Sequence, residues 1–418
     1  MKNKYLKYLN YFLVSTIVAV SGFPVIVQYD DTIIILVLIL TILILIFRRT
    51  NIEKSFLIFL SVFIILTSIQ LITFNVFPLD TMLGFFSKII VAYLIIKVVN
   101  RSFINTYVNL MYFISIISFL FWLPSFVSVG LKVLIVKSAP FWIEGFDFHS
   151  YIIYQPFIGD INEWTRNSGP FWEAGAFAGF LIIALILNYI RSYQFSDRKT
   201  FVITIGVLST FSTTGYIALF LFFVFVLLIK YRNLLSTILA IFVIIPAIIL
   251  AYQKIPFLSE KISSQIESSD TKIALTVHRS RFSSAIIDLQ DFKEHPLAGR
   301  GKYSETRFNI WVKAINRNNG TTDLLVMYGL VGFLTYFMYY FISFRNIMKY
   351  YNRRNKLFSY YYILIILILG FSENYFLLPF FWSLCFIGFT IKGQVISQSP
   401  NELSGTKALI IKHSQTSF

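Results

Sequence analysis

Residues 166–179, RNSGPFWEAGAFAG, open an apolar run that continues without a charge to Ile190. Pro170 suits the first position of an α-helix, because the N–H that it lacks has no helical partner there. We therefore expect a membrane helix from Pro170 to Ile190, with Glu173 in its first turn at the positive end of the helix dipole. A cation, Arg166, stands just before this helix start.

Two glycines, Gly175 and Gly179, form a G-x-x-x-G pair inside this stretch. Small residues at this spacing let a neighbouring membrane helix approach closely. The charged residues beside them have two readings. Arg166 is either an anchor at the membrane interface or part of a functional site, and Glu173 is either an ordinary helix-start carboxylate or a partner of Arg166.

The composition is that of a membrane protein with many spans. Of the 418 residues, 57% are hydrophobic and only 13% are charged, and the mean hydropathy is +0.72. The net charge of +16 comes largely from basic residues in short loops between apolar runs, a pattern that orients membrane proteins and does not indicate nucleic acid binding. Cys385 is the single cysteine, which excludes a disulfide within the chain and a Cys-based metal site, and we interpret it as a core residue.

Apolar runs of membrane-spanning length recur along the whole chain, so we predict one all-α integral membrane domain, 1–418, with about twelve transmembrane helices. The predicted spans are Tyr8–Val27, Thr32–Phe47, Ser55–Phe74, Thr81–Val99, Asn105–Val129, Pro170–Ile190, Thr200–Thr213, Gly215–Ile229, Asn233–Tyr252, Leu324–Phe344, Leu357–Gly370 and Tyr375–Ile391. Basic residues occupy alternate loops, which places both termini and the tail 392–418 in the cytoplasm.

Two longer polar segments, 130–168 and 253–322, then lie outside. The second contains an amphipathic helix over Arg281–Glu294. Its apolar residues share one face, and Ser284, Asp288 and Asp291 lie opposite. The segment from His295 to Gly301, which contains Pro296 and two glycines, ends this helix.

Three motifs resemble the O-antigen polymerase and ligase superfamily, which includes the Wzy-type polymerases of surface polysaccharides. The pattern R-x-x-G-x-x-x-E over Arg166–Glu173 resembles its central motif, although Ala174 stands where members usually have Pro. Arg281, the amphipathic helix and His295–Gly301 together resemble its large periplasmic loop. Asn318–Leu325, followed by Tyr328–Gly332, resembles the segment that closes that loop.

The resemblance implies a glycosyltransferase at the outer face of a bacterial cytoplasmic (inner) membrane. Its substrates would be undecaprenyl-pyrophosphate-linked oligosaccharide repeat units, joined into O-antigen, capsular polysaccharide or exopolysaccharide. A flippase and a chain-length regulator would be partners, besides the lipid bilayer. No cofactor, metal or nucleic acid is expected.

Arginines of the external segments can make charge-assisted contacts to the phosphates of such a substrate. We assign catalytic roles to Arg166, Glu173 and Arg281, with Glu173 either orienting Arg166 or acting as a general base. The substrate-binding candidates are Arg279, His295, Arg300, Asn318 and Asn319.

Two alternatives stay open. One is an O-antigen ligase, for which a His would be expected where Asn318 stands. The other is a flippase or transporter, which would place ionisable residues at mid-membrane, whereas here nearly all charges except Lys88 lie in loops.

Overall fold

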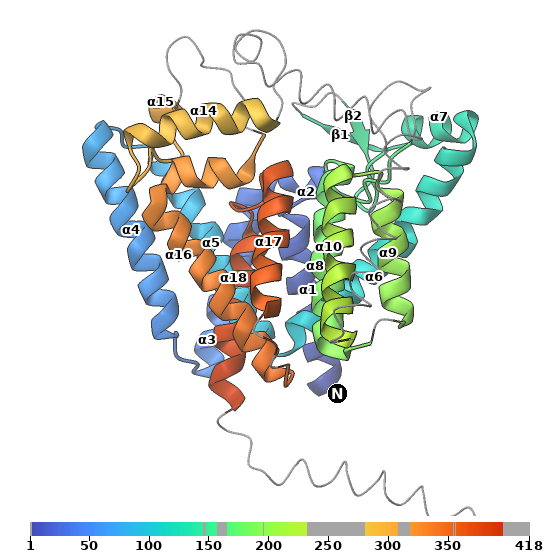
Figure 1. Cartoon of the computed structure of the whole chain (residues 1–418), viewed down its shortest axis with the longest axis horizontal. Helices are drawn as coiled ribbons and strands as arrows, with labels where there is room; N and C mark the ends of the chain where they lie inside the picture. The colour runs from blue at the N-terminus through green and yellow to red at the C-terminus, as the bar shows by residue number, and fades with distance from the viewer. Residues whose placement is uncertain are drawn as a thin grey trace, which may run out of the picture.

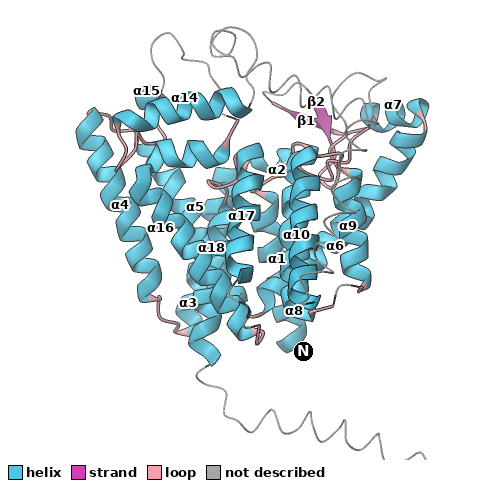
Figure 2. Ribbon diagram, in the orientation of Figure 1, coloured by secondary structure: helices cyan, strands magenta, loops and turns pink. Residues whose placement is uncertain are grey.

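The structure is a computed structural model that describes residues 2–144, 148–156, 165–194, 196–231, 281–307, 318–353, 355 and 357–395. Over these ranges the chain is a bundle of helices with one two-stranded hairpin (Figure 1 and Figure 2). Helix α14 lies across one end of the bundle, together with the hairpin and α7, and the chain begins at the opposite end (Figure 1).

The elements follow in chain order. They are α1 (Lys2–Ala19), α2 (Pro24–Val27), α3 (Asp30–Arg48), α4 (Lys54–Phe74), α5 (Leu79–Val99), α6 (Ser102–Val127), α7 (Val129–Lys137), β1 (Phe141–Ile143), β2 (Phe148–Ser150), α8 (Ala174–Ser192), α9 (Arg198–Ser209), α10 (Thr213–Tyr231), α14 (Arg281–Glu294), α15 (Ser304–Arg307), α16 (Gly320–Tyr350), α17 (Leu357–Ser372) and α18 (Pro379–Val395).

Six helices in the described part of the chain are long and apolar enough to cross a membrane: α3, α4, α5, α6, α8 and α16. Three shorter apolar helices accompany them, Thr213–Leu228, Leu357–Ser372 and Pro379–Ile391. This architecture is consistent with an all-α membrane protein. The predicted count of about twelve spans is not confirmed, and the span predicted at Asn233–Tyr252 lies outside the described residues.

Helix α8 is the most buried of the six candidate spans, with 94% of its apolar window inside the protein. A turn, and not a neighbouring helix, packs against its two glycines. The side chain of Tyr375, in the connection between α17 and α18, contacts both of them. A Cβ at Gly179 would overlap the hydroxyl of Tyr375, and that hydroxyl donates a hydrogen bond to the carbonyl of Gly175 at 2.9 Å. The close approach predicted from the glycines is therefore present, with a different partner.

The predicted start of this helix is wrong. Helix α8 begins at Ala174, and Pro170 lies in a turn before it, where the N–H of Phe171 donates to the carbonyl of Ser168 at 3.0 Å. The buried ring of Phe171 packs on Phe23 and Phe180, which holds the chain in that turn. Glu173 is consequently the extended N-cap residue of α8, with φ −154° and ψ 165°, and not part of its first turn.

The segment 130–168, predicted to be an external loop, contains regular structure in its described part. It contains α7 and the antiparallel pair β1–β2, in which Trp142 is paired with His149. Their rings meet edge to face with centroids 5.0 Å apart. Cross-strand ring contacts of this kind stabilise a short pair of strands.

The amphipathic helix predicted over Arg281–Glu294 is confirmed as α14, with the predicted bounds. Its polar side faces the protein, since Ser283, Ser284 and Asp288 are buried. Its apolar side faces outward, and both Phe282 and Leu289 are 46% exposed. An outward apolar face suits a helix lying in the membrane interface.

Helix α16 is broken at Gly329, whose φ is 60°. The break opens two helical hydrogen bonds, and the segment that follows α14 supplies new partners for all four groups. The N–H groups of Leu330 and Val331 donate to the carbonyls of Pro296 and Leu297, at 2.8 and 3.3 Å. The carbonyls of Val326 and Met327 accept from the N–H groups of Arg300 and Gly301, further along the same loop, at 2.8 and 2.9 Å.

Candidate functional site

Three charged residues from distant parts of the chain meet beneath the first turn of α14. Arg281 is the first residue of α14, Glu173 is the N-cap of α8, and Glu373 follows the last residue of α17. The Nη2 atom of Arg281 lies 3.3 Å from Oε1 of Glu373 and 3.6 Å from Oε1 of Glu173. Its Nε donates to the carbonyl of Ser372 at 2.7 Å, which fixes the plane of the guanidinium.

The two carboxyl groups differ in their access to solvent. The side chain of Glu373 is 7% exposed, whereas that of Glu173 is 44% exposed. Burial raises the pKa of Glu373 well above its usual 4.5, and the nearby carboxylate of Glu173 raises it further, although Arg281 opposes this. The result is a buried carboxyl that holds its proton to a higher pH than a solvated glutamate does.

Arg166 lies in the same electrostatic environment. Its Nε donates to the carbonyl of Thr210 at 3.2 Å, which holds it against the turn between α9 and α10. Burial lowers the pKa of Arg166, while Glu173 and Glu373 both raise it and Arg281 lowers it. The guanidinium stays charged, because arginine does not deprotonate in proteins. Arg166, Glu173 and Arg281, selected from the sequence, are therefore brought together.

Asn319 connects this cluster to α16. It is fully buried and caps the helix, and its Oδ1 accepts from the N–H groups of Thr321 and Thr322 at 3.2 and 3.1 Å. Its Nδ2 donates to the carbonyl of Arg281 at 3.4 Å. Asn319 thus positions the start of α14, and the exposed Asn318 beside it is held through its N–H, which donates to Oγ of Ser284 at 3.4 Å.

His295 and Arg300 lie away from this cluster. They follow the far end of α14, a helix of 14 residues and hence about 20 Å long. The ring of His295 packs on Phe74 with centroids 4.8 Å apart. Arg300 pairs with Glu294 and donates from Nη1 to the carbonyl of Thr306 at 2.9 Å. The structure does not bring these two candidates to Arg281, and Arg279 lies outside the described residues.

A second charged network lies buried under the middle of α14. Arg307 forms an ion pair with Asp323, and its Nη2 is 3.9 Å from Oδ1 of Asp288. The hydroxyl of Thr322 donates to Oδ2 of Asp288 at 2.6 Å. These contacts join α14, α15 and α16, and we interpret them as the support that fixes α14 over the bundle.

Sequence reasoning missed Glu373. It stands in the short turn Ser372-Glu373-Asn374 between two apolar helices, where a lone carboxylate has an ordinary reading as a solvated turn residue. The pairing with Arg281 spans some 90 residues, and no local pattern indicates it. The one available signal was a single acidic residue on the same predicted side of the membrane as Arg166 and Arg281.

Chemically, the cluster combines two guanidinium groups, which bind anions, with two carboxyl groups of unequal exposure. Within the described ranges, His, Cys, Asp and Glu form no group of three or more that could hold a metal ion. Neither a scan against protein-family models nor a search of curated protein sequences finds a match to this chain.

Proposed function

We propose that the protein is a glycosyltransferase that polymerises undecaprenyl-pyrophosphate-linked oligosaccharide repeat units at the outer face of a bacterial cytoplasmic membrane. The observation that carries the proposal is the convergence of Arg166, Glu173 and Arg281 with Glu373 at the end of the bundle covered by α14. Arg166 and Glu173 belong to one motif and Arg281 to another, so the contact between Arg281 and Glu173 is an independent support for a common role of the two motifs.

In the proposed reaction, a hydroxyl of the acceptor sugar attacks the anomeric carbon of the donor chain. The bond from that carbon to the pyrophosphate oxygen breaks, and the pyrophosphate leaves with the electron pair. Arg166 and Arg281 stabilise the charge that develops on the leaving oxygen. The hydroxyl proton passes to Glu173, the carboxylate with the greater exposure.

Glu373 is a positioning residue in this scheme. It contacts the same nitrogen of Arg281 as Glu173 does. Because it favours the protonated form, it fixes Arg281 without adding a second full negative charge where the pyrophosphate must bind.

A ligase of the same superfamily is the second candidate. Asn318 supports the polymerase over the ligase, because it lies exposed beside the cluster and an amide does not titrate. Transport is less favoured. Lys88, the charge that interrupts a predicted span, lies 2.6 Å from Asp30 and is neutralised there. In this proposal both termini are cytoplasmic, and a flippase and a chain-length regulator are partners.

The test is complementation in the native host with Arg166→Ala and Arg281→Ala at matched membrane levels. Arg345→Ala is the control, since Arg345 lies near the other end of α16, where its guanidinium is 5.7 Å from the ring centroid of Phe341. We expect the surface polysaccharide ladder to collapse to one repeat unit in both site variants and to persist in the control. A normal ladder that fails to reach its acceptor would indicate a ligase, and an unchanged ladder in both would contradict the site.

A further inference from the structure

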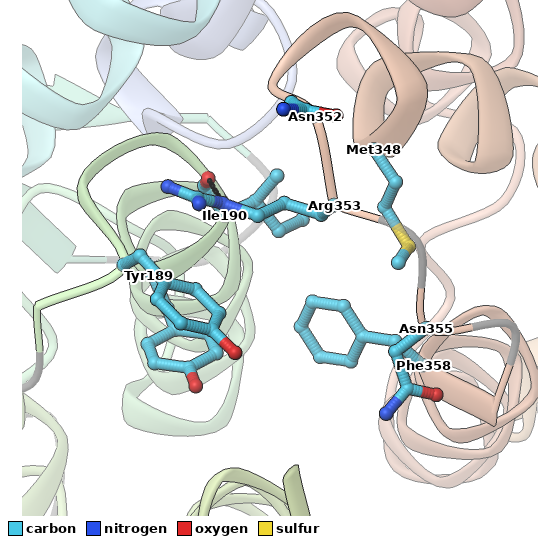
Figure 3. A pocket seen from close by; sticks show the side chains of 8 residues that line it. Tyr189, Ile190, Met348, Asn352, Arg353, Asn355 and Phe358 are labelled. Carbon is cyan, nitrogen blue, oxygen red and sulfur yellow. Dashed lines mark hydrogen bonds between the residues drawn. The ribbon is translucent and has the colours of Figure 1, made fainter. Parts of the chain in front are cut away.

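A cavity of about 290 Å³ lies between the ends of α8 and α16 (Figure 3). This is the end of the bundle opposite α14 and the arginine and glutamate cluster (Figure 1). The cavity is enclosed by the last turn of α8, the last turn of α16, and the loop and first turn of α17. The lining residues are Tyr189, Ile190, Tyr193, Met348, Asn352, Arg353, Asn355 and Phe358. Its volume is near the lower end of the range for small-ligand sites, roughly 300–1,000 Å³.

Among the described residues of the lining, Arg353 is the one cation and none is a carboxylate. It reaches from the α16–α17 loop to α8, where its Nε donates to the carbonyl of Ile190 at 3.1 Å (Figure 3). Its guanidinium also stacks on the ring of Tyr193, 4.2 Å from the centroid. Both contacts hold the side chain in place, and neither uses the two Nη groups, which are left to donate to a ligand.

The rest of the lining is partly polar and partly apolar. Asn352, Asn355 and the tyrosine hydroxyls supply neutral hydrogen-bonding groups, while Ile190, Met348 and Phe358 supply a buried apolar wall. Such a lining suits a small anionic group attached to an apolar or neutral body. A free carboxylate or sulfate would leave the apolar wall unused.

The surroundings are basic as well. Lys349 lies in the last turn of α16, directly after the lining residue Met348, and Arg354 and Lys356 follow Arg353 in sequence. Basic pockets between membrane helices, near the level of the headgroups, favour anionic lipids, and each nearby cation adds to the attraction of an anionic surface.

We propose that this cavity binds a phosphate ester, held by Arg353 and supplied by the headgroup of an anionic lipid. The planar fork of arginine matches two phosphate oxygens, and its fixed position lowers the entropy lost on binding. The apolar wall then contacts the diacylglycerol part of the lipid. The site lies at the opposite end of the bundle from Arg281, so the proposal does not depend on the catalytic scheme.

The test is native mass spectrometry of the full-length protein in detergent, titrated with phosphatidylglycerol, with diacylglycerol and with glycerol 3-phosphate. We expect Arg353→Gln to weaken the first phosphatidylglycerol binding step about tenfold, since hydrogen bonds to a charged group are lost. Arg49→Gln removes the same charge from an exposed position at the end of α3 that does not line the cavity, and it should change that step less than twofold.

Diacylglycerol distinguishes phosphate recognition from simple apolar burial. Equal affinity for diacylglycerol and phosphatidylglycerol, or equal affinity of the wild type and Arg353→Gln, would overturn the proposal. Glycerol 3-phosphate identifies the source, because binding as tight as that of the lipid, and dependent on Arg353, would confirm the phosphate site and assign it to a soluble phosphate ester.

Arg353→Gln also removes the contact to Ile190, so a second variant guards against misfolding. Met348→Trp fills the cavity from its apolar wall and leaves the arginine in place. We expect the same tenfold loss of lipid binding, with a melting temperature in lipid-free detergent close to that of the wild type. Wild-type lipid affinity in this variant would show that the lipid binds elsewhere.

Discussion

The carboxyl of Glu373 gives a prediction that can be tested without knowing the substrate. In the folded protein the pKa of this group is raised by burial and by Glu173, while in the unfolded chain it returns to about 4.5. Between these two values the folded protein holds a proton that the unfolded chain has lost. The free energy of unfolding therefore falls as the pH rises, by about 1.4 kcal/mol per pH unit for one proton, and levels off above the folded pKa.

Glu373→Gln removes this term, because the amide has nearly the shape of the protonated acid and does not ionise. The variant and the wild type should have similar stability near pH 5. Above that pH the variant should become the more stable one, by about 1.4 kcal/mol for each unit until the folded pKa is reached. The neighbouring charges, Glu173, Arg281 and Arg166, are present in both proteins and cancel in the comparison to first order.

The measurement is reversible unfolding in mixed micelles at several pH values from 5 to 8. Glu294→Gln is the matched control, since the side chain of Glu294 is 64% exposed and should give a curve parallel to the wild type. A wild type that gains stability over Glu373→Gln as the pH rises would refute the reasoning. It would show that the attraction of Arg281 exceeds the cost of burial and that Glu373 is ionised.

Two further substitutions test the packing around the site. Gly179→Ala places a methyl group against the hydroxyl of Tyr375 and should destabilise the protein by about 1–3 kcal/mol, measured in the same unfolding assay; Gly84→Ala, where a Cβ meets nothing within 4 Å, should be neutral or stabilising. Arg307→Ala leaves Asp288 buried without its cation and should cost about 3–5 kcal/mol. Adding Asp288→Asn should recover part of that loss, and no recovery would argue against an electrostatic cause.

The sequence was informative wherever a pattern was local. The bounds of α14 follow from its helical period and from the Pro and Gly residues after Glu294, and α14 begins at Arg281 as predicted. Most apolar runs likewise correspond to helices in the described part of the chain, although the predicted span Tyr8–Val27 is divided between α1 and α2. Burial of the polar side of α14 was not predictable in the same way, because an amphipathic period does not say which face meets the protein.

Features that depend on distant partners were missed or misplaced. Pro170 has the local character of a helix start, yet the packing of Phe171 against Phe23 keeps it in a turn. Glu373 has no local mark of function, since its partners lie in α8 and α14. The candidates His295 and Arg300 were grouped with Arg281 by sequence order, and the length of α14 separates them.

The broken helix α16 has a consequence for the order in which the protein assembles. Without the loop after α14, the backbone N–H and carbonyl groups on both sides of Gly329 could pair only within a straight α16. Unpaired backbone groups are costly in an apolar environment. We therefore expect α16 to enter the membrane as one continuous helix and to bend only when Pro296–Gly301 arrives. On this view, the cluster at Arg281 is completed in a late step of folding, after the spans have formed.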